Sequence, residues 1–267
     1  MAKQLPFNIT SYDLIKAFAI LSMILDHTGF YFFEDDNWWR VAGRLCVPIW
    51  FFLVGYADSR DIGPRMWIGG TILVLASLAV GMWVFPLNVL FSMLVVRLCL
   101  DHVMKACKTS GESFFAMTFC LFLLIPISYS YWEYGTQGIL LAMFGYIMKN
   151  RPVVTDITNP DLVPKLFGLF AFSQFIFIQG LLFKFDLPQM IVLSAGLFAV
   201  NYVLFFFRPA EYPVLTRKLP KFAVSGVQFL GRRTLEIYVG HLILFKFLMM
   251  VIDPDRFQWF HPTLMMP

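Results

Sequence analysis

The chain of 267 residues has a composition that excludes an ordinary soluble protein. Apolar residues make up 59% of it and charged residues only 14%, and its mean hydropathy is +0.70. Soluble domains are about half apolar and about a quarter charged. A soluble protein could not cover its surface adequately from this mixture of side chains, so we expect the chain to use lipid as its main solvent.

The net charge of +4 is small, and the basic residues gather at the ends of apolar runs. This distribution suits an anionic membrane surface and lacks the basic stripe that is typical of nucleic-acid-binding proteins. The cysteines lie in or beside apolar runs without any Cys-x-x-Cys pair, which favours small packing residues over disulfides, and we expect no metal site. They are Cys46, Cys99, Cys107 and Cys120.

Apolar runs of about 20 residues, the length that a membrane-spanning helix needs, recur along the chain. We predict an all-α, polytopic membrane helix bundle with about nine spans, within a range of eight to ten, in one domain over 1–267. The stretches 150–164 and 208–232 are rich in Pro, Lys and Arg and are predicted to be surface loops. The predicted spans are 12–33, 41–58, 66–85, 87–104, 113–130, 134–149, 165–184, 188–207 and 233–252.

The positions of Lys and Arg predict the orientation of these spans. With a cytoplasmic N-terminus, fourteen of these residues fall in cytoplasmic segments, and the opposite side holds four, which are Arg40, Arg44, Lys184 and Arg256. The acidic stretch 34–36 then lies outside. The first apolar run has no small-residue cleavage site after it, so we expect it to remain as a membrane helix.

Ionisable residues inside membrane spans are costly and therefore mark candidate functional sites. Lys16 and His27 share one face of the first span, because eleven helical steps bring them within about 20° of each other. His27 lies about 21 Å along the helix from Asp13, in the external half of a bilayer core of roughly 30 Å. Burying an Asp there costs about 2.5–3.5 kcal/mol. We therefore interpret Asp26-His27 as functional, against the alternative that His27 only packs and bonds a backbone carbonyl.

The next predicted span supplies basic residues near this pair. Asp26 is rotated by about 100° from His27, so we expect it to face a cation on another helix, and Arg44 is the obvious candidate. Arg40 and Arg44 are four residues apart and form a pair of guanidiniums at the external end. For Arg40, contact with lipid headgroups and binding of a substrate both remain open, whereas the deeper Arg44 is expected to hold a partner or substrate.

Other polar residues give weaker signals. Arg97 and Asp101 are four residues apart and are predicted to form a salt bridge with each other. His241 lies in the middle of the last span, where a hydrogen bond to a neighbouring helix and a functional role are both open. Glu133 precedes a predicted external helix start, where a carboxylate would cap the helix whatever its chemistry. His102 is interpreted as a surface residue.

A series of short motifs runs from residue 13 to about residue 242: Asp13-Leu14-Ile15-Lys16, Asp26-His27, Ala42-Gly43-Arg44, Pro48, Gly55-Tyr56, Asn88-Val89-Leu90-Phe91, Tyr134-Gly135 and Ile237-Tyr238 with His241-Leu242. In this order, the motifs resemble those of the TraX family of membrane acetyltransferases. The first two predicted spans carry the specific part, and the last motif is also similar to the wider membrane acyltransferase superfamily. The family often has Asp-Tyr-Gly where this chain has Glu133-Tyr134-Gly135.

The resemblance implies transfer of an acetyl group from acetyl-CoA, as co-substrate, by a multi-pass protein of the bacterial inner membrane. The founding activity of the family is acetylation of a conjugative pilin at its amino terminus, and related enzymes acetylate sugars across the bilayer with a His on an early helix. The acceptor is therefore expected to be an amine or hydroxyl of a protein, glycan or lipid. Which acceptor it is, and whether the protein forms oligomers, are not decided by the sequence.

Acyl transfer needs a base and a positive group for the developing negative charge. His27 is the expected base, directly or through an acetyl-histidine, because its ordinary pKa of about 6.5 lies near working pH. Asp26 would fix the surrounding charge and Arg44 would stabilise the acyl oxygen. Lys16 and Arg97 are expected to contact acetyl-CoA. The expected substrate-binding residues are Arg40, Asn88, Glu133, Tyr134 and His241.

Two other classes of function remain as alternatives. In a proton-coupled transporter, Lys16, Asp26 and His27 would form a relay. The sequence has neither a clear internal repeat nor paired glycine-broken helices, which are common marks of transporters. In a non-catalytic membrane scaffold, His27 and Arg44 would serve packing only.

Overall fold

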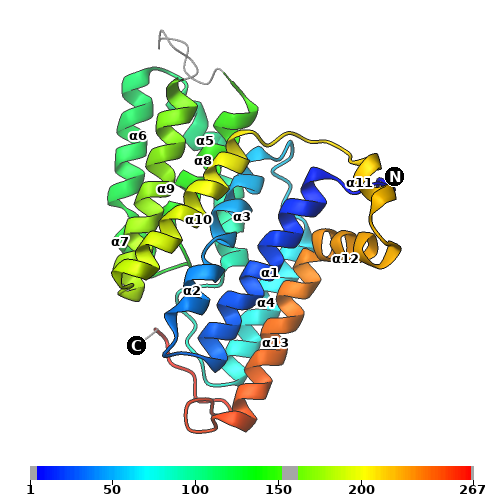
Figure 1. The fold of residues 1–267 in the computed structure, drawn as a ribbon. Helices are drawn as coiled ribbons and strands as arrows, with labels where there is room; N and C mark the ends of the chain where they lie inside the picture. Colours follow the sequence, from blue (N-terminus) through cyan, green and yellow to red (C-terminus); the bar gives the residue numbers. More distant parts are fainter. Residues whose placement is uncertain (1–4, 152–161, 266–267) are drawn as a thin grey trace.

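The structure is a computed structural model that describes residues 5–151 and 162–265. In these residues the secondary structure consists of helices and a few isolated β-bridges, which confirms the all-α prediction (Figure 1). Within the described ranges, four helices are long and apolar enough to cross a membrane: α1 (Ser11–Phe32), α9 (Leu162–Phe183), α10 (Leu187–Phe205) and α13 (Thr234–Ile252). The other helices are α2 (Asn37–Gly43), α3 (Cys46–Tyr56), α4 (Pro64–Ala79), α5 (Val89–Cys107), α6 (Gly111–Leu123), α7 (Ile125–Ser128), α8 (Gly135–Lys149), α11 (Pro213–Lys218) and α12 (Lys221–Arg232).

Each predicted span contains helix, but the spans predicted over 113–130 and 41–58 are each divided into two helices, α6 and α7 in the first and α2 and α3 in the second. α2 ends at Gly43 and α3 begins at Cys46. Pro48 explains the break, because it has no N–H to bond the carbonyl of Arg44 four residues earlier and its ring would clash with that carbonyl. As a result Arg44 lies at the C-terminal cap of α2 with its side chain buried.

The prediction that 208–232 is a surface loop is wrong, because this stretch forms α11 and α12. Pro213 and Pro220 stand at the starts of these helices, where a residue without a free N–H costs no hydrogen bond. In Figure 1, α12 lies crosswise to α1 and α13, at the end of the molecule near the N-terminus. The other predicted loop, 150–164, falls mostly outside the described residues.

Segments that are predicted to share one side of a membrane lie together at one end of the bundle. At the first end, the carboxylate of Asp58 after α3 pairs with Lys149 in the last turn of α8. At the opposite end, Glu34 after α1 pairs with Arg256 after α13. Consecutive predicted spans therefore run in alternating directions, and α1 and α13 run the same way side by side (Figure 1).

The contact between α3 and α8 forms the centre of the core. A Cβ added to Gly145 would lie under 3.0 Å from the backbone of Phe52, and one added to Gly55 would meet the backbone of Ala142 equally closely. Small residues at such contacts let helix backbones approach each other, which gains van der Waals packing where lipid provides no hydrophobic drive. The two glycines therefore determine how closely α3 and α8 pack.

Two Gly-Arg dipeptides hold the two aspartates of α1 in the same manner. Gly43-Arg44 closes α2, with the glycine against the backbone of Asp26 and the guanidinium at its carboxylate. Gly231-Arg232 closes off α12, with the glycine against Asp13 and the guanidinium 2.9 Å from both carboxylate oxygens. Each glycine leaves room for the approach, and each arginine neutralises a buried carboxylate.

We predict that Gly145→Ala destabilises the protein by about 1–3 kcal/mol, because the new methyl group must displace the backbone of Phe52. Gly226→Ala in α12 is the matched control, since a Cβ there meets nothing within 4 Å. Alanine at that helix position should be neutral or stabilising by up to about 1 kcal/mol. Thermal unfolding in detergent measures both, and equal midpoints for the two variants would contradict the role given to Gly145.

Candidate functional site

Asp26 on α1 is a buried carboxylate that two guanidiniums neutralise. Nη1 of Arg40 lies 3.0 Å from its Oδ2, and the same nitrogen donates to the backbone carbonyl of Asp26 at 2.8 Å. Nε of Arg44 lies 3.4 Å from Oδ1. This confirms the predicted pairing of Asp26 with Arg44, and it places Arg40 in the same cluster. Ser22 adds hydrogen bonds from its hydroxyl to the carbonyls of Ala42 and Gly43, which fix the end of α2 against α1.

Arg44 also connects this cluster to the start of α8. Its Nη1 donates to the hydroxyl of Tyr134, a buried residue with a left-handed backbone (φ 66°) just before α8. The preceding residue, Glu133, is held by a backbone hydrogen bond to the carbonyl of Leu87 at 2.9 Å. The guanidinium of Arg44 has five N–H donors, so these contacts leave some of them for a further acceptor.

His27 contacts the second predicted histidine. Its Nδ1 lies 2.7 Å from Nε2 of His241 on α13, and the ring centroids are 5.0 Å apart. The ring of Tyr238, one helical turn before His241, lies 5.9 Å from that of each histidine. The structure therefore brings together α1 and α13, whose histidines are 214 positions apart in the sequence.

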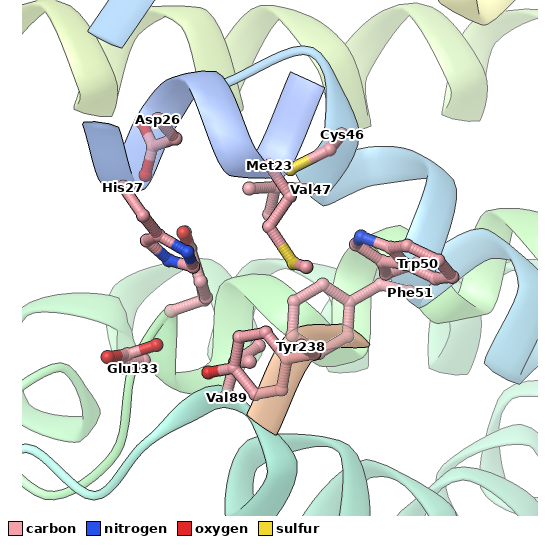
Figure 2. Close-up of a pocket in the computed structure, with 11 residues that line it drawn as sticks. Met23, Asp26, His27, Cys46, Val47, Trp50, Phe51, Val89, Glu133 and Tyr238 are labelled. Carbon is pink, nitrogen blue, oxygen red and sulfur yellow. The ribbon is translucent and has the colours of Figure 1, made fainter. Parts of the chain in front are cut away.

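Two cavities meet at His27. The larger has a volume of about 700 Å³, and the smaller, of about 30 Å³, is large enough for roughly one water. In Figure 2, His27 projects from α1 towards the space near Glu133 and Tyr238, with Met23 and Phe51 on the other side of the smaller cavity. Residues that line both cavities are Asp26, His27, Glu133, Tyr134 and Tyr238.

The larger cavity reaches one end of the bundle. The lining includes Glu34 after α1, Asn37 at the start of α2, Pro86 before α5, Ser130 after α7 and Met265 near the C-terminus. These segments are the ones that the distribution of Lys and Arg predicts to be external. The cavity therefore opens at the end of the bundle remote from the first residues of α1.

Glu133 and Asn88, two of the residues expected to bind substrate, both line the larger cavity but in different ways. Asn88 caps α5 by accepting from the N–H of Leu90 and donates to the carbonyl of Gly70, so its side chain is mostly committed to structure. Glu133 forms no cap of α8, whose N-terminal cap is Tyr134 without a side-chain bond. Burial raises the pKa of Glu133 to about 7. Its carboxyl therefore exchanges protons near neutral pH.

Lys16 and Arg97, the residues predicted for acetyl-CoA, lie away from this site. Lys16 is half-buried and lies over the ring of Tyr12, 5.8 Å from its centroid. The predicted salt bridge between Arg97 and Asp101 is wrong. Arg97 instead donates to the carbonyl of Asp61 at 3.1 Å, and Asp101 pairs with Arg60 at 3.3 Å. Both side chains are therefore bound by residues of the connection between α3 and α4, and not by each other.

Two residues of the site were given no role by the sequence prediction, although Tyr238 belongs to the last family motif and Lys246 is an ionisable residue inside a predicted span. Tyr238, Leu242 and Lys246 follow one another at intervals of four residues on α13, and all three line the larger cavity. One face of α13 therefore forms part of the cavity wall. Lys246 is 5% exposed and donates to the hydroxyl of Ser77 on α4. A lysine inside an apolar span was the available signal, because such a residue needs a polar partner or a water-filled cavity.

No group of three His, Cys, Asp or Glu side chains suited to a metal ion is found in the described residues. All four cysteines are free. Cys46 and Cys107 are buried as predicted, but Cys120 is exposed on the outer face of α6, so the prediction that it packs in the core is wrong.

We predict that Asp26→Ala destabilises the protein by about 3–5 kcal/mol, because the change leaves the guanidiniums of Arg40 and Arg44 buried without their counter-charge. Asp35→Ala is the control, since Asp35 is an exposed acid in the connection after α1. Thermal unfolding in detergent should show a large loss for the first variant and none for the second. A wild-type midpoint for Asp26→Ala would show that the cluster does not hold α1 and α2 together.

Comparison with known proteins identifies the family. An uncharacterised protein of Rickettsia prowazekii (strain Madrid E) is 24% identical over 249 residues, which cover 90% of this chain and 93% of the relative. Protein TraX of Escherichia coli is 29% identical over 141 residues, which cover 50% of this chain and 54% of that protein. No solved structure matches significantly. The profile of the family described as TraX protein matches residues 11–180, so the chain belongs to the TraX protein family.

Proposed function

We propose that this protein is an integral membrane acetyltransferase that transfers an acetyl group from acetyl-CoA to an amine or hydroxyl. Membership of the TraX family supports the reaction class. The observation that carries the proposal is the position of His27, at the meeting point of two cavities and next to a cluster of two guanidiniums and a carboxylate. A base beside positive groups is the arrangement that acyl transfer requires.

We place the protein in the bacterial inner membrane with about nine spans and a cytoplasmic N-terminus. Four long apolar helices and two shorter ones support membrane insertion, and the alternating direction of the helices supports the higher number of spans. In this orientation the larger cavity opens to the external side. The acceptor then reaches His27 from the external side of the inner membrane, through the larger cavity.

In the proposed mechanism, His27 takes the proton of the acceptor amine or hydroxyl as it attacks. Acetyl-CoA, when bound, supplies the acetyl group as a thioester. The free N–H donors of Arg44 stabilise negative charge on the acyl oxygen. Asp26 holds this guanidinium in place and offsets its charge, so that the positive groups do not repel each other in a buried site.

Lys16 is our candidate for a phosphate contact of acetyl-CoA. It forms no salt bridge within the described residues and lies about three helical turns from His27 on the same face, towards the opposite end of the bundle. Asp13, the carboxylate that interacts with Lys16 from one turn earlier, is itself paired with Arg232, so the half-buried amine can still bind an anionic ligand. Neither cavity includes Lys16, so access between it and His27 needs side chains such as Met23 to move, which the flexible thioether allows. Arg97, which donates a hydrogen bond to the backbone carbonyl of Asp61, is the second candidate for a phosphate contact at this end.

For the acceptor we propose the larger cavity, with Arg40, Asn88, Glu133, Tyr134 and Lys246 in its wall. A cavity of about 700 Å³ has the size of ordinary small-molecule sites. Its wall presents both carboxyl and cationic groups, which suits a polar acceptor. The amine or hydroxyl of a protein terminus, a glycan or a lipid headgroup would each fit this chemistry.

We expect His27→Ala to abolish release of CoA from acetyl-CoA by the purified protein, with little loss of stability, because alanine leaves no unpaired buried charge. His102→Ala is the matched control, since His102 is exposed on α5 and remote from the cavities. The assay follows free thiol in the presence of a mixture of amine and sugar acceptors. Undiminished CoA release by His27→Ala would remove His27 as the base, and no release by the wild type would favour a transporter or scaffold.

A further inference from the structure

A continuous chain of hydrogen bonds ends at His27. In α13, Nδ1 of His241 lies 2.6 Å from the carbonyl oxygen of Ile237, one turn earlier. Nε2 of the same ring lies 2.7 Å from Nδ1 of His27. The chain therefore runs from a backbone carbonyl through one imidazole to the other.

The carbonyl oxygen at the start of this chain decides where the protons are. An oxygen of this kind only accepts hydrogen bonds, so Nδ1 of His241 must carry a hydrogen. In a neutral imidazole the other nitrogen is then an acceptor, and Nε2 of His241 therefore accepts from Nδ1–H of His27. By the same rule, Nε2 of His27 has no hydrogen and keeps its lone pair.

We infer that His241 is a positioning residue that holds His27 in the Nδ1–H tautomer, so that Nε2 of His27 is free to take the acceptor's proton. The inference rests on the proposed function for its consequence in catalysis, whereas the tautomer is a property of the protein itself. The role differs from the substrate contact that the sequence suggested for His241.

The surroundings of His241 suit this role. Its ring packs edge-on against Phe245 at 5.5 Å and near Tyr238 at 5.9 Å, so its orientation is restricted from two sides. An orienting partner for a catalytic histidine is often a carboxylate. A neutral imidazole does the same task within a membrane bundle without the cost of burying another charge.

The proton transfer balances with this arrangement. The acceptor's heteroatom forms a bond to the acetyl carbon while its proton passes to Nε2 of His27. The bond from that carbon to the CoA sulfur breaks, and the sulfur leaves with the electron pair. His27, now protonated on both nitrogens, still donates from Nδ1 to His241, and its Nε2 proton then passes to the departing sulfur.

Two substitutions separate the role of the ring nitrogen from that of the ring's volume. His241→Leu fills much of the space but removes the acceptor, and His241→Gln retains an oxygen that can accept from Nδ1–H of His27. His102→Leu is the matched control, because Nδ1 of His102 bonds the carbonyl of Leu98 at 3.2 Å, one turn earlier, on an exposed face of α5. The chain has four histidines, so the ring signals are few enough to assign by substitution.

The test combines nitrogen NMR of ring-labelled histidine in the purified protein with initial rates of CoA release. We expect the wild type to show the Nδ1–H form of His27, and His241→Leu to show the Nε2–H form or a mixture. The kcat of His241→Leu should fall by about 10–100-fold, with a smaller change in KM for acetyl-CoA, and His241→Gln should recover most of it. His102→Leu should match the wild type in both measurements.

The inference is overturned by an Nε2–H form of His27 in the wild type, or by an unchanged tautomer and kcat in His241→Leu. A fall in kcat that His241→Gln does not recover, with the tautomer unchanged, would assign His241 to packing alone. If the wild type releases no CoA, the proposed function fails, while the tautomer measurement still decides whether His241 sets the state of His27.

Discussion

The buried charge of Asp26 is the interaction on which the rest of the site depends. A carboxylate at that depth is stable only with a counter-charge, and Arg40 and Arg44 provide two. To reach it, α2 must lie directly against α1, which the absence of a side chain at Gly43 allows. Arg44 then extends the arrangement to Tyr134 and the start of α8. One ion cluster therefore determines the relative positions of α1, α2 and α8. His27 directly follows Asp26, the carboxylate at the centre of this cluster.

The sequence allowed the prediction of the helices and of the Asp26–Arg44 pair, because apolar runs and buried charges leave strong one-dimensional signals. Other features depended on contacts that a single sequence does not contain. Arg97 and Asp101 have the spacing of a salt bridge, yet Arg60 and the backbone near Asp61 bind them instead. The pair of His27 and His241 joins residues 214 positions apart, so only the parallel packing of α1 and α13 reveals it. The break before α3 could have been predicted, since Pro48 cannot bond the carbonyl of Arg44.

The two ends of the bundle differ in a way that suits a reaction between substrates from opposite sides of a membrane. The larger cavity opens at one end, and its polar wall includes Glu133 and Lys246. Lys16 and Arg97 lie towards the other end, where the basic loops gather. His27 lies between them, next to side chains such as Met23 that separate the larger cavity from the opposite half. A transporter would need a continuous path for its substrate, whereas an acetyltransferase needs only the acetyl group to pass this point.

Sided membrane vesicles test this account most directly. Acetyl-labelled acetyl-CoA is added outside everted vesicles, which expose the cytoplasmic face, and outside right-side-out vesicles, and label bound to material on the opposite side of the membrane is measured. We predict that label crosses into the lumen of everted vesicles, that right-side-out vesicles transfer none, and that His27→Ala abolishes the signal while His102→Ala preserves it. Equal transfer by both kinds of vesicle, or transfer that persists in His27→Ala, would contradict the central claim that His27, as the base, serves transfer of an acetyl group from cytoplasmic acetyl-CoA to an external acceptor.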